Sequence, residues 1–262
     1  MRKEPDQDKN IGGQWHTDHS YDQVPALGSI LLARDVPPRG GDTLFAAMWR
    51  AYDALSEGLK KTLEGLRAVH SSRHVFGPEA RRVRNMGDRL VNAEQATQDA
   101  VHPVVICHPE NGRKILYVNR TFTTHFEGWT AEESKPLLEY LYNHGARAEF
   151  QTRFQWKPGS IAIWDNRSTQ HYAVADYWPH HRINQRVTFD LPGTGREGGN
   201  VNQAVLGGHI DSGVGEWNAV FGTFTNNLIV GDTVFDEPRG SINLFPFVVI
   251  GDGAGTPYTA FG

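Results

Sequence analysis

The chain has 262 residues, a formal net charge of −4 and 39% hydrophobic residues. This is enough apolar material for one sizeable core, and the slight negative charge gives no general attraction to nucleic acid or to a membrane surface. No run of eighteen apolar residues could span a bilayer, and the charged N-terminus lacks the apolar segment of a signal peptide. The single cysteine excludes a disulfide framework. We therefore expect a cytoplasmic protein that binds neither nucleic acid nor membranes.

The first third of the chain combines a strand signal with helical periodicity. Apolar and small residues from Ala26 to Leu32, followed by the turn-rich stretch 37–42, predict a buried strand and a tight turn. Residues 46–66 have helical periodicity, and Ser56 is suited to cap a second short helix. Residues 77–100 are charged and lack an apolar stripe. They predict a long surface excursion.

The middle of the chain is rich in short strand signals. Thr130 and Glu133 fit a capping box that begins a helix. Four short β-like segments are separated by turn signals, at residues 101–107, 115–118, 161–164 and 186–191. This pattern favours a mainly β sandwich or barrel with flanking helices over a parallel α/β sheet.

The composition changes after Pro192. Residues 193–262 are rich in glycine and poor in charge, with strand-like pieces at 223–230 and 243–250. We find no catalytic pattern and no repeat period there. We therefore divide the chain into a domain over residues 1–192 and a Gly-rich C-terminal segment whose role the sequence does not identify.

The tetrapeptide Trp15-His16-Thr17-Asp18 suggests a metal site. In an extended strand, side chains two residues apart point to the same face, so His16 and Asp18 would converge on one point. One imidazole and one carboxylate supply two corners of the 2-His-1-carboxylate triad that binds Fe(II) with open positions. A lone His-x-Asp is weak evidence, because the tripeptide often occurs by chance.

A third ligand and two cationic side chains follow later in the chain. His171 lies after the strand-like segment 161–164, and Arg182 and Arg186 would share one face of the next strand. Two inward-facing arginines are costly in a β core unless they meet anions. Singly, a core histidine and two solvated arginines are the commoner outcomes. Together, these residues predict a metal beside two anionic ligands.

The sequence resembles the TauD/TfdA family of 2-oxoglutarate-dependent dioxygenases over residues 15–191. The matching motifs are WHTD at 15–18, GGDTLFA at 40–46, YVN at 117–119 with FTT at 122–124, IAIWDNRSTQHYA at 161–173 and DYWPHHRINQR at 176–186. The resemblance implies a double-stranded β-helix, or jelly-roll, core with helices packed outside. Fold-level kinship alone does not name the substrate.

The resemblance also implies roles for individual residues. His16, Asp18 and His171 would ligate Fe(II), and Thr43 and Arg182 would hold the distal carboxylate of 2-oxoglutarate. Arg186 and Phe122 would contact the primary substrate, and Trp164 would pack beside the metal. The implied reaction uses O₂ and 2-oxoglutarate to hydroxylate a small anionic molecule, giving succinate and CO₂. Candidate substrates are a sulfonate, a sulfate ester or a carboxylate such as an aryloxy acid.

The chain departs from the family in three ways. Only fifteen residues precede His16, where relatives carry a long segment, so we expect an N-terminally truncated domain. Relatives usually end soon after the strand that holds Arg186, so residues 193–262 are additional and could cover an exposed sheet edge. Gly12 and Ser72 replace an asparagine and an aromatic residue of members that act on taurine, which argues against taurine itself.

Two other functions stay open at the level of sequence. One is a truncated, non-catalytic jelly roll that binds a metal or a small anion without turnover. The other is a zinc hydrolase on the same three ligands, which would leave Thr43 and Arg182 without a role. Related enzymes commonly form dimers or larger assemblies, so the resemblance is compatible with a homo-oligomer.

Overall fold

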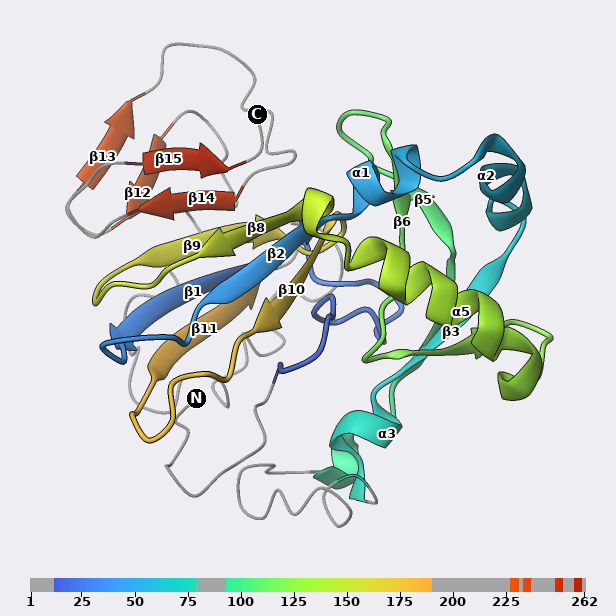
Figure 1. Ribbon diagram of the computed structural model, residues 1–262, viewed down its shortest axis with the longest axis horizontal. Coiled ribbons are helices and arrows are strands. Elements are labelled where there is room, and N and C mark those ends of the chain that lie inside the picture. The colour runs from blue at the N-terminus through green and yellow to red at the C-terminus, as the bar shows by residue number, and fades with distance from the viewer. Residues whose placement is uncertain are drawn as a thin grey trace.

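The computed structural model describes residues 12–78, 80 and 93–189, together with four short strands between residues 227 and 260. Two antiparallel sheets form the framework (Figure 1). The strands of these two sheets are β1 (Gly28–Asp35), β2 (Thr43–Ala47), β8 (Gln151–Phe154), β9 (Ile161–Asp165), β10 (Thr169–Ala173), β11 (Ile183–Phe189), β14 (Val248–Gly251) and β15 (Pro257–Ala260). One sheet has the order β11-β1-β9-β14-β15 and the other the order β10-β2-β8.

The two sheets pack face to face through alternating side chains. In the first sheet, Leu31 of β1 lies opposite Arg186 of β11 and Ala162 of β9, so all three point to the same face. A buried cluster joins this face to the second sheet, and its members are Ala33, Phe45, Phe154, Trp156, Ala162 and Trp164. The jelly-roll class predicted from the sequence is confirmed.

A second layer of structure flanks the sheets on one side (Figure 1). Its helices are α1 (Met48–Asp53), α2 (Glu57–Leu63), α3 (Arg73–Phe76) and α5 (Ala131–Gly145), with the 3-10 turns η2 (Ala93–Gln95) and η3 (Ala148–Phe150). Its strands form a sheet of β4 (Asp99–Pro103), β3 (Arg67–Ser71) and β7 (Thr123–Phe126), in that order, and a hairpin of β5 (Val105–Cys107) and β6 (Lys114–Leu116). A second buried cluster, which includes Met48, Leu116 and Leu141, packs α1 and α5 against this hairpin.

The predicted helix signals correspond to real helix starts. Ser56 accepts a hydrogen bond from Leu59 N at the start of α2. Thr130 and Glu133 form the reciprocal capping box of α5, with each side chain bonded to the other residue's backbone. Among the described helices, none is long and apolar enough to cross a membrane.

Some boundaries differ from the sequence prediction. The strand expected over 101–107 is divided at Val104, which is buried between β4 and β5 and bonds Leu66 and Tyr117 through its backbone. Most of the expected excursion, residues 79 and 81–92, lies outside the described residues. In the C-terminal segment, β12 (Asn227–Val230) pairs with β13 (Thr233–Asp236), and β14 pairs with β9. The other residues after 189 lie outside the described part.

Candidate metal centre

The two predicted histidine ligands are joined by backbone pairing. His16 and His171 form an isolated antiparallel bridge, in which each backbone N–H donates to the other's carbonyl at 3.1 and 2.9 Å. Residues paired in this way point their side chains to the same face, and the two rings lie 4.0 Å apart between centroids. Thus a pairing between distant parts of the chain brings the first and third predicted ligands together.

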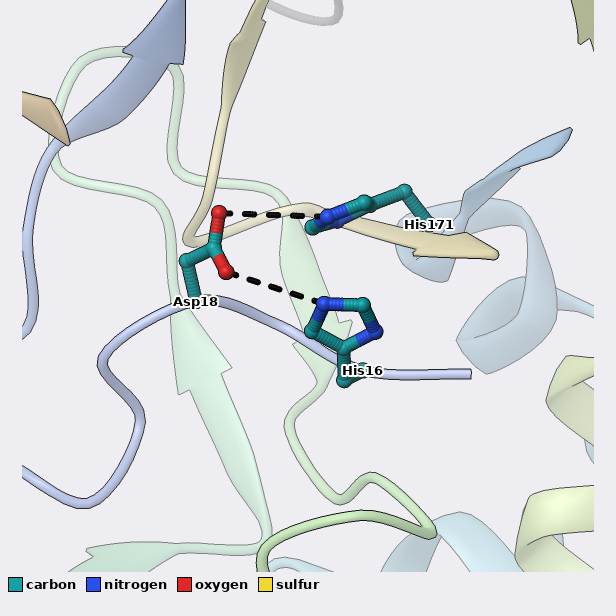
Figure 2. A group of neighbouring side chains, drawn as sticks. All are labelled: His16, Asp18 and His171. Atoms are coloured by element: carbon teal, nitrogen blue, oxygen red, sulfur yellow. Dashed lines mark ion pairs between the residues drawn. The ribbon is translucent and has the colours of Figure 1, made fainter. Parts of the chain in front are cut away.

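Asp18 completes the group (Figure 2). Its Oδ1 lies 3.7 Å from His16 Nε2, and its Oδ2 lies 3.8 Å from His171 Nε2. All three potential ligand atoms lie within 4.8 Å of one another, and all three residues are buried. The separations are too long for hydrogen bonds. The group therefore has the composition and convergence of a 2-His-1-carboxylate site.

The ionisation of the three side chains suits metal binding. Burial lowers the pKa of His16 and lowers that of His171 further, so both imidazoles are neutral near pH 7. Burial would raise the pKa of Asp18, but Arg186 and the two histidines outweigh it and keep this pKa below its usual value. Metal ligands must be deprotonated in this way.

The tautomer of His16 can also be assigned. Its Nδ1 lies 2.7 Å from the carbonyl oxygen of Gln14, and a carbonyl can only accept. Nδ1 therefore carries the hydrogen, and the lone pair of Nε2 points toward Asp18. A backbone carbonyl in this position is the usual support for a metal-binding imidazole. The donor set thus fits a first-row divalent metal such as Fe(II).

Two partners hold the Asp18 carboxylate from the β1-β11 side. Ser29 Oγ donates to Oδ2 at 2.9 Å, and Arg186 Nη1 donates to Oδ1 at 2.8 Å. The sequence predicted that Arg186 faces inward, and the structure places its guanidinium against the metal-ligand candidate. The Arg186 side chain keeps 22% of its surface exposed.

Thr43 and Arg182 lie together, as the resemblance implied. Arg182 Nη2 donates to Thr43 Oγ1 at 3.2 Å, and Trp156 Nε1 donates to the same oxygen at 3.0 Å. These two donors occupy the acceptor sites of the hydroxyl, so its own hydrogen is directed elsewhere. Arg182 is buried, and burial lowers its pKa. A buried guanidinium beside a donating hydroxyl is a suitable receptor for a carboxylate.

Aromatic side chains cover one side of the candidate site. The ring of Phe122 is buried and lies 4.8 Å from Tyr21, 5.8 Å from Phe76 and 6.2 Å from His16, measured between centroids. Trp164, predicted to pack beside the metal, is buried 4.8 Å from the His171 ring. Sequence reasoning named Phe122 but missed Tyr21 and Phe76, since only their packing against Phe122 distinguishes them from other aromatic residues.

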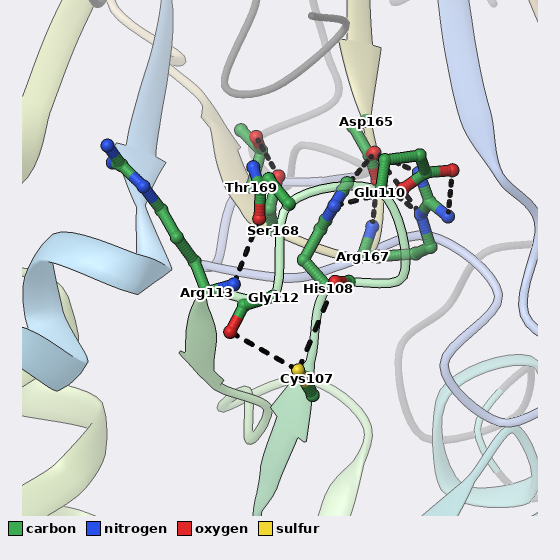
Figure 3. A network of polar contacts seen from close by, with 10 residues as sticks. Cys107, His108, Glu110, Gly112, Arg113, Asp165, Arg167, Ser168 and Thr169 are labelled. Atoms are coloured by element: carbon green, nitrogen blue, oxygen red, sulfur yellow. Dashed lines mark hydrogen bonds and ion pairs between the residues drawn. The ribbon is translucent and has the colours of Figure 1, made fainter.

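A separate polar network joins the β9-β10 turn to the loop between β5 and β6 (Figure 3). The buried His108 places Nε2 3.0 Å from Asp165 Oδ2 and Nδ1 2.9 Å from Glu110 Oε2. Arg167 contacts both carboxylates, at 2.5 Å from Asp165 and 3.1 Å from Glu110. These ion pairs tie the β5-β6 hairpin to the turn that precedes His171.

Comparison with known proteins identifies the family. The family model for "Taurine catabolism dioxygenase TauD, TfdA family" matches residues 2–188. An alkylsulfatase from Acinetobacter baylyi is 41% identical over 177 residues, which are 66% of this chain and 55% of that protein. The chain spans about half the length of the curated relatives it matches.

Solved structures agree with this assignment. A taurine dioxygenase from Burkholderia xenovorans is 35% identical, with a TM-score of 0.58, over 72% of this chain and 60% of that one. AAD-2 in complex with Mn(II) and N-oxalylglycine is 32% identical, with a TM-score of 0.58, over 68% and 64% of the two chains. The chain belongs to the TauD/TfdA family.

Proposed function

We propose that this chain is an Fe(II)- and 2-oxoglutarate-dependent dioxygenase that hydroxylates a small anionic organic molecule, giving succinate and CO₂. The observation that carries the proposal is the convergence of His16, Asp18 and His171 within 4.8 Å in a buried site. Family membership supports the same reading. A zinc hydrolase would need only the triad and would not use the buried Thr43 and Arg182 pair.

Different residues would bind the metal and 2-oxoglutarate. His16, Asp18 and His171 would hold the iron, and the Thr43 hydroxyl and Arg182 guanidinium would bind the distal carboxylate of 2-oxoglutarate. When bound, the iron and 2-oxoglutarate supply the oxidising chemistry, while the protein orients the reactants and excludes water. The burial of all five residues fits this second task.

The primary substrate is expected to combine an anionic group with an apolar body. Arg186, with a partly exposed side chain, lies on one side of the triad. The Phe122 ring lies beside His16, and Tyr21 and Phe76 pack against Phe122. Sulfate esters, sulfonates and aryloxy acids have this form, and the alkylsulfatase relative is named for one of these classes. At position 72, relatives that act on taurine are expected to carry an aromatic residue. This chain has the small Ser72, whose hydroxyl donates to Gln98 Oε1 at 2.8 Å.

The test is succinate formation by purified protein supplied with Fe(II), 2-oxoglutarate and O₂. An alkyl sulfate, an alkanesulfonate and an aryloxyacetate are each added, and Asp18→Ala serves as the control without a complete triad. We expect substrate-dependent succinate from the unmodified chain and none from the variant. Metal binding without succinate, across all three classes, would instead support a non-catalytic metal- or anion-binding relative.

A further inference from the structure

The Asp18 carboxylate is held by a hydroxyl that has a second neighbour. Ser29 Oγ, fully buried on β1, lies 2.9 Å from Asp18 Oδ2 and 3.1 Å from the side-chain amide of Asn166. Ser29 lies opposite Trp164 in the β1-β9 register, so it points to the inner face of the sheet. Asn166 is also fully buried, in the turn between β9 and β10.

The hydrogen-bond inventory favours one orientation of the Asn166 amide toward Ser29. A serine hydroxyl carries one hydrogen, so it cannot donate fully to both the carboxylate and an amide oxygen. With the oxygen of Asn166 toward Ser29, the buried Nδ2 also lacks a partner among the described residues. The reverse orientation removes the competition for the Ser29 hydrogen, because Nδ2 then donates to Ser29 Oγ. The two ends of an amide have the same shape, so this exchange needs no movement of the backbone.

We propose that Asn166 and Ser29 are positioning residues for the metal ligand, joined in a relay in which Asn166 Nδ2 donates to Ser29 Oγ and Ser29 donates to Asp18 Oδ2. The inference rests on the proposed function, since it assigns these two residues to the same metal site. With Arg186 on Oδ1, each carboxylate oxygen then has one fixed donor. The plane of the carboxylate is thereby set before a metal binds.

The relay is anchored at its far end. Asn166 N donates to the carbonyl of Leu27 at 2.9 Å, and its neighbours Asp165 and Arg167 belong to the ion-pair network around His108 (Figure 3). A side chain between two such anchors has little freedom to turn. Removing a residue that hydrogen-bonds a metal ligand typically lowers metal affinity by about 10- to 100-fold.

The test is Mn(II) affinity, measured by the electron paramagnetic resonance signal of unbound Mn(II), with the Co(II) visible spectrum as a second readout of ligand geometry. The variants are Ser29→Ala, Asn166→Ala and the double variant, and Ser168→Ala is the matched control. Ser168 is a fully buried serine near the same turn, and its hydroxyl lies 3.5 Å from Thr169 Oγ1. Thermal unfolding of the metal-free proteins reports any general loss of stability.

The sign of the Asn166→Ala effect decides the orientation. The relay predicts about 10-fold weaker Mn(II) binding for each single variant, no further loss in the double variant and an altered Co(II) spectrum. If the amide oxygen competed for the Ser29 hydrogen, Asn166→Ala would leave affinity unchanged or raise it, and the relay would be wrong. This holds even if Ser29→Ala fails to fold.

Failure of the relay and failure of the proposed function give different results. If the unmodified chain binds no Mn(II), the metal site itself is wrong, and the relay falls with it. If the unmodified chain binds Mn(II) but both single variants bind as Ser168→Ala does, only the relay is overturned.

Discussion

Two buried groups of histidine and aspartate in this molecule differ in how completely their charges are paired. Around His108, both ring nitrogens lie within 3.0 Å of a carboxylate oxygen, and Arg167 forms ion pairs with both carboxylates. In the metal centre, the Nε2 atoms of His16 and His171 approach Asp18 only to 3.7 and 3.8 Å. In the first group the side chains pair closely with one another, whereas in the second the three potential ligand atoms converge without bonding to one another.

In this molecule the difference separates the His108 network from the candidate metal centre, although both contain histidine and aspartate. The His108 network pairs its own side chains through short contacts, so its role is to hold the β5-β6 hairpin against the β9-β10 turn. The metal centre keeps two neutral imidazoles and an ionised carboxylate facing one point. A shared cation would satisfy all three, and only this second group should respond to metal.

The largest expected effect comes from removing the central carboxylate. Asp18→Ala deletes one of three ligands and leaves Arg186 without its acidic partner. We expect Mn(II) affinity to fall by more than about 100-fold, beyond the effect typical of supporting residues. Calorimetric titration with Mn(II) measures this, and retention of near-normal affinity would mean that Asp18 is not a ligand.

The matching change in the His108 network should affect stability. Asp165→Ala leaves buried His108 and Arg167 without their shared carboxylate. Breaking a buried pair in this way costs about 3–5 kcal/mol of unfolding free energy, which urea denaturation measures. The control is Asp99→Ala, whose partner Arg73 is more than half exposed, and which should cost less than about 1 kcal/mol. Equal losses in the two variants would contradict the comparison.

A third buried histidine provides a test by pH. Burial lowers the pKa of His70 to about 3, and the facing His102 acts in the same direction, while Tyr117 stacks on the His70 ring. In the unfolded chain a histidine titrates near 6.5, so between pH 6.5 and 3 the unfolded state binds more protons. The stability contributed by neutral His70 is therefore complete above pH 6.5 and is lost as pH falls toward 3.

The measurement is the unfolding free energy at pH 7 and pH 5. We expect the unmodified protein to lose about 2 kcal/mol more than His70→Gln over this interval, because the variant has no imidazole to protonate at this position. His74→Gln, which changes a histidine on the surface, serves as the control and should follow the unmodified protein. Parallel pH dependences of His70→Gln and the unmodified protein would contradict a neutral, buried His70.

The smallest expected effects distinguish the two arginines. Arg186→Ala should weaken binding of the anionic substrate by about 10-fold, because one charge-assisted hydrogen bond is lost. The same variant should change the affinity for 2-oxoglutarate little. Arg182→Ala should do the reverse, because Arg182 lies with Thr43 and not with Asp18. Each variant is thus the control for the other. An unchanged substrate affinity in Arg186→Ala would show that this arginine serves Asp18 alone.

Much of the fold was predictable because its signals are local. The capping box at Thr130 and Glu133 and the N-cap at Ser56 fix two helix starts within a few residues of chain. The strand signal at 161–164 corresponds to β9 almost residue for residue. Val104 interrupts an apolar run for a tertiary reason, its backbone contacts with Leu66 and Tyr117, which no local pattern contains.

The sequence predicted the residues that converge in the candidate site but not the side chains that bond to them. His16, Asp18, His171, Thr43 and Arg182 are motif residues. Ser29 is a single polar residue in an apolar run, and its polarity was the one signal that could have pointed to it. Trp156 carries no such signal, since its bond to Thr43 depends on the meeting of β2 with the end of β8. Supports of this kind become visible only once distant strands are placed together.

The most direct test of the central claim is the visible spectrum of the protein with Fe(II) and 2-oxoglutarate in the absence of O₂. If the triad holds iron and the Thr43 and Arg182 pair holds the co-substrate, a weak metal-to-ligand charge-transfer band appears in the unmodified chain and is missing from Asp18→Ala. Absence of the band from the folded, unmodified chain would contradict the proposed dioxygenase.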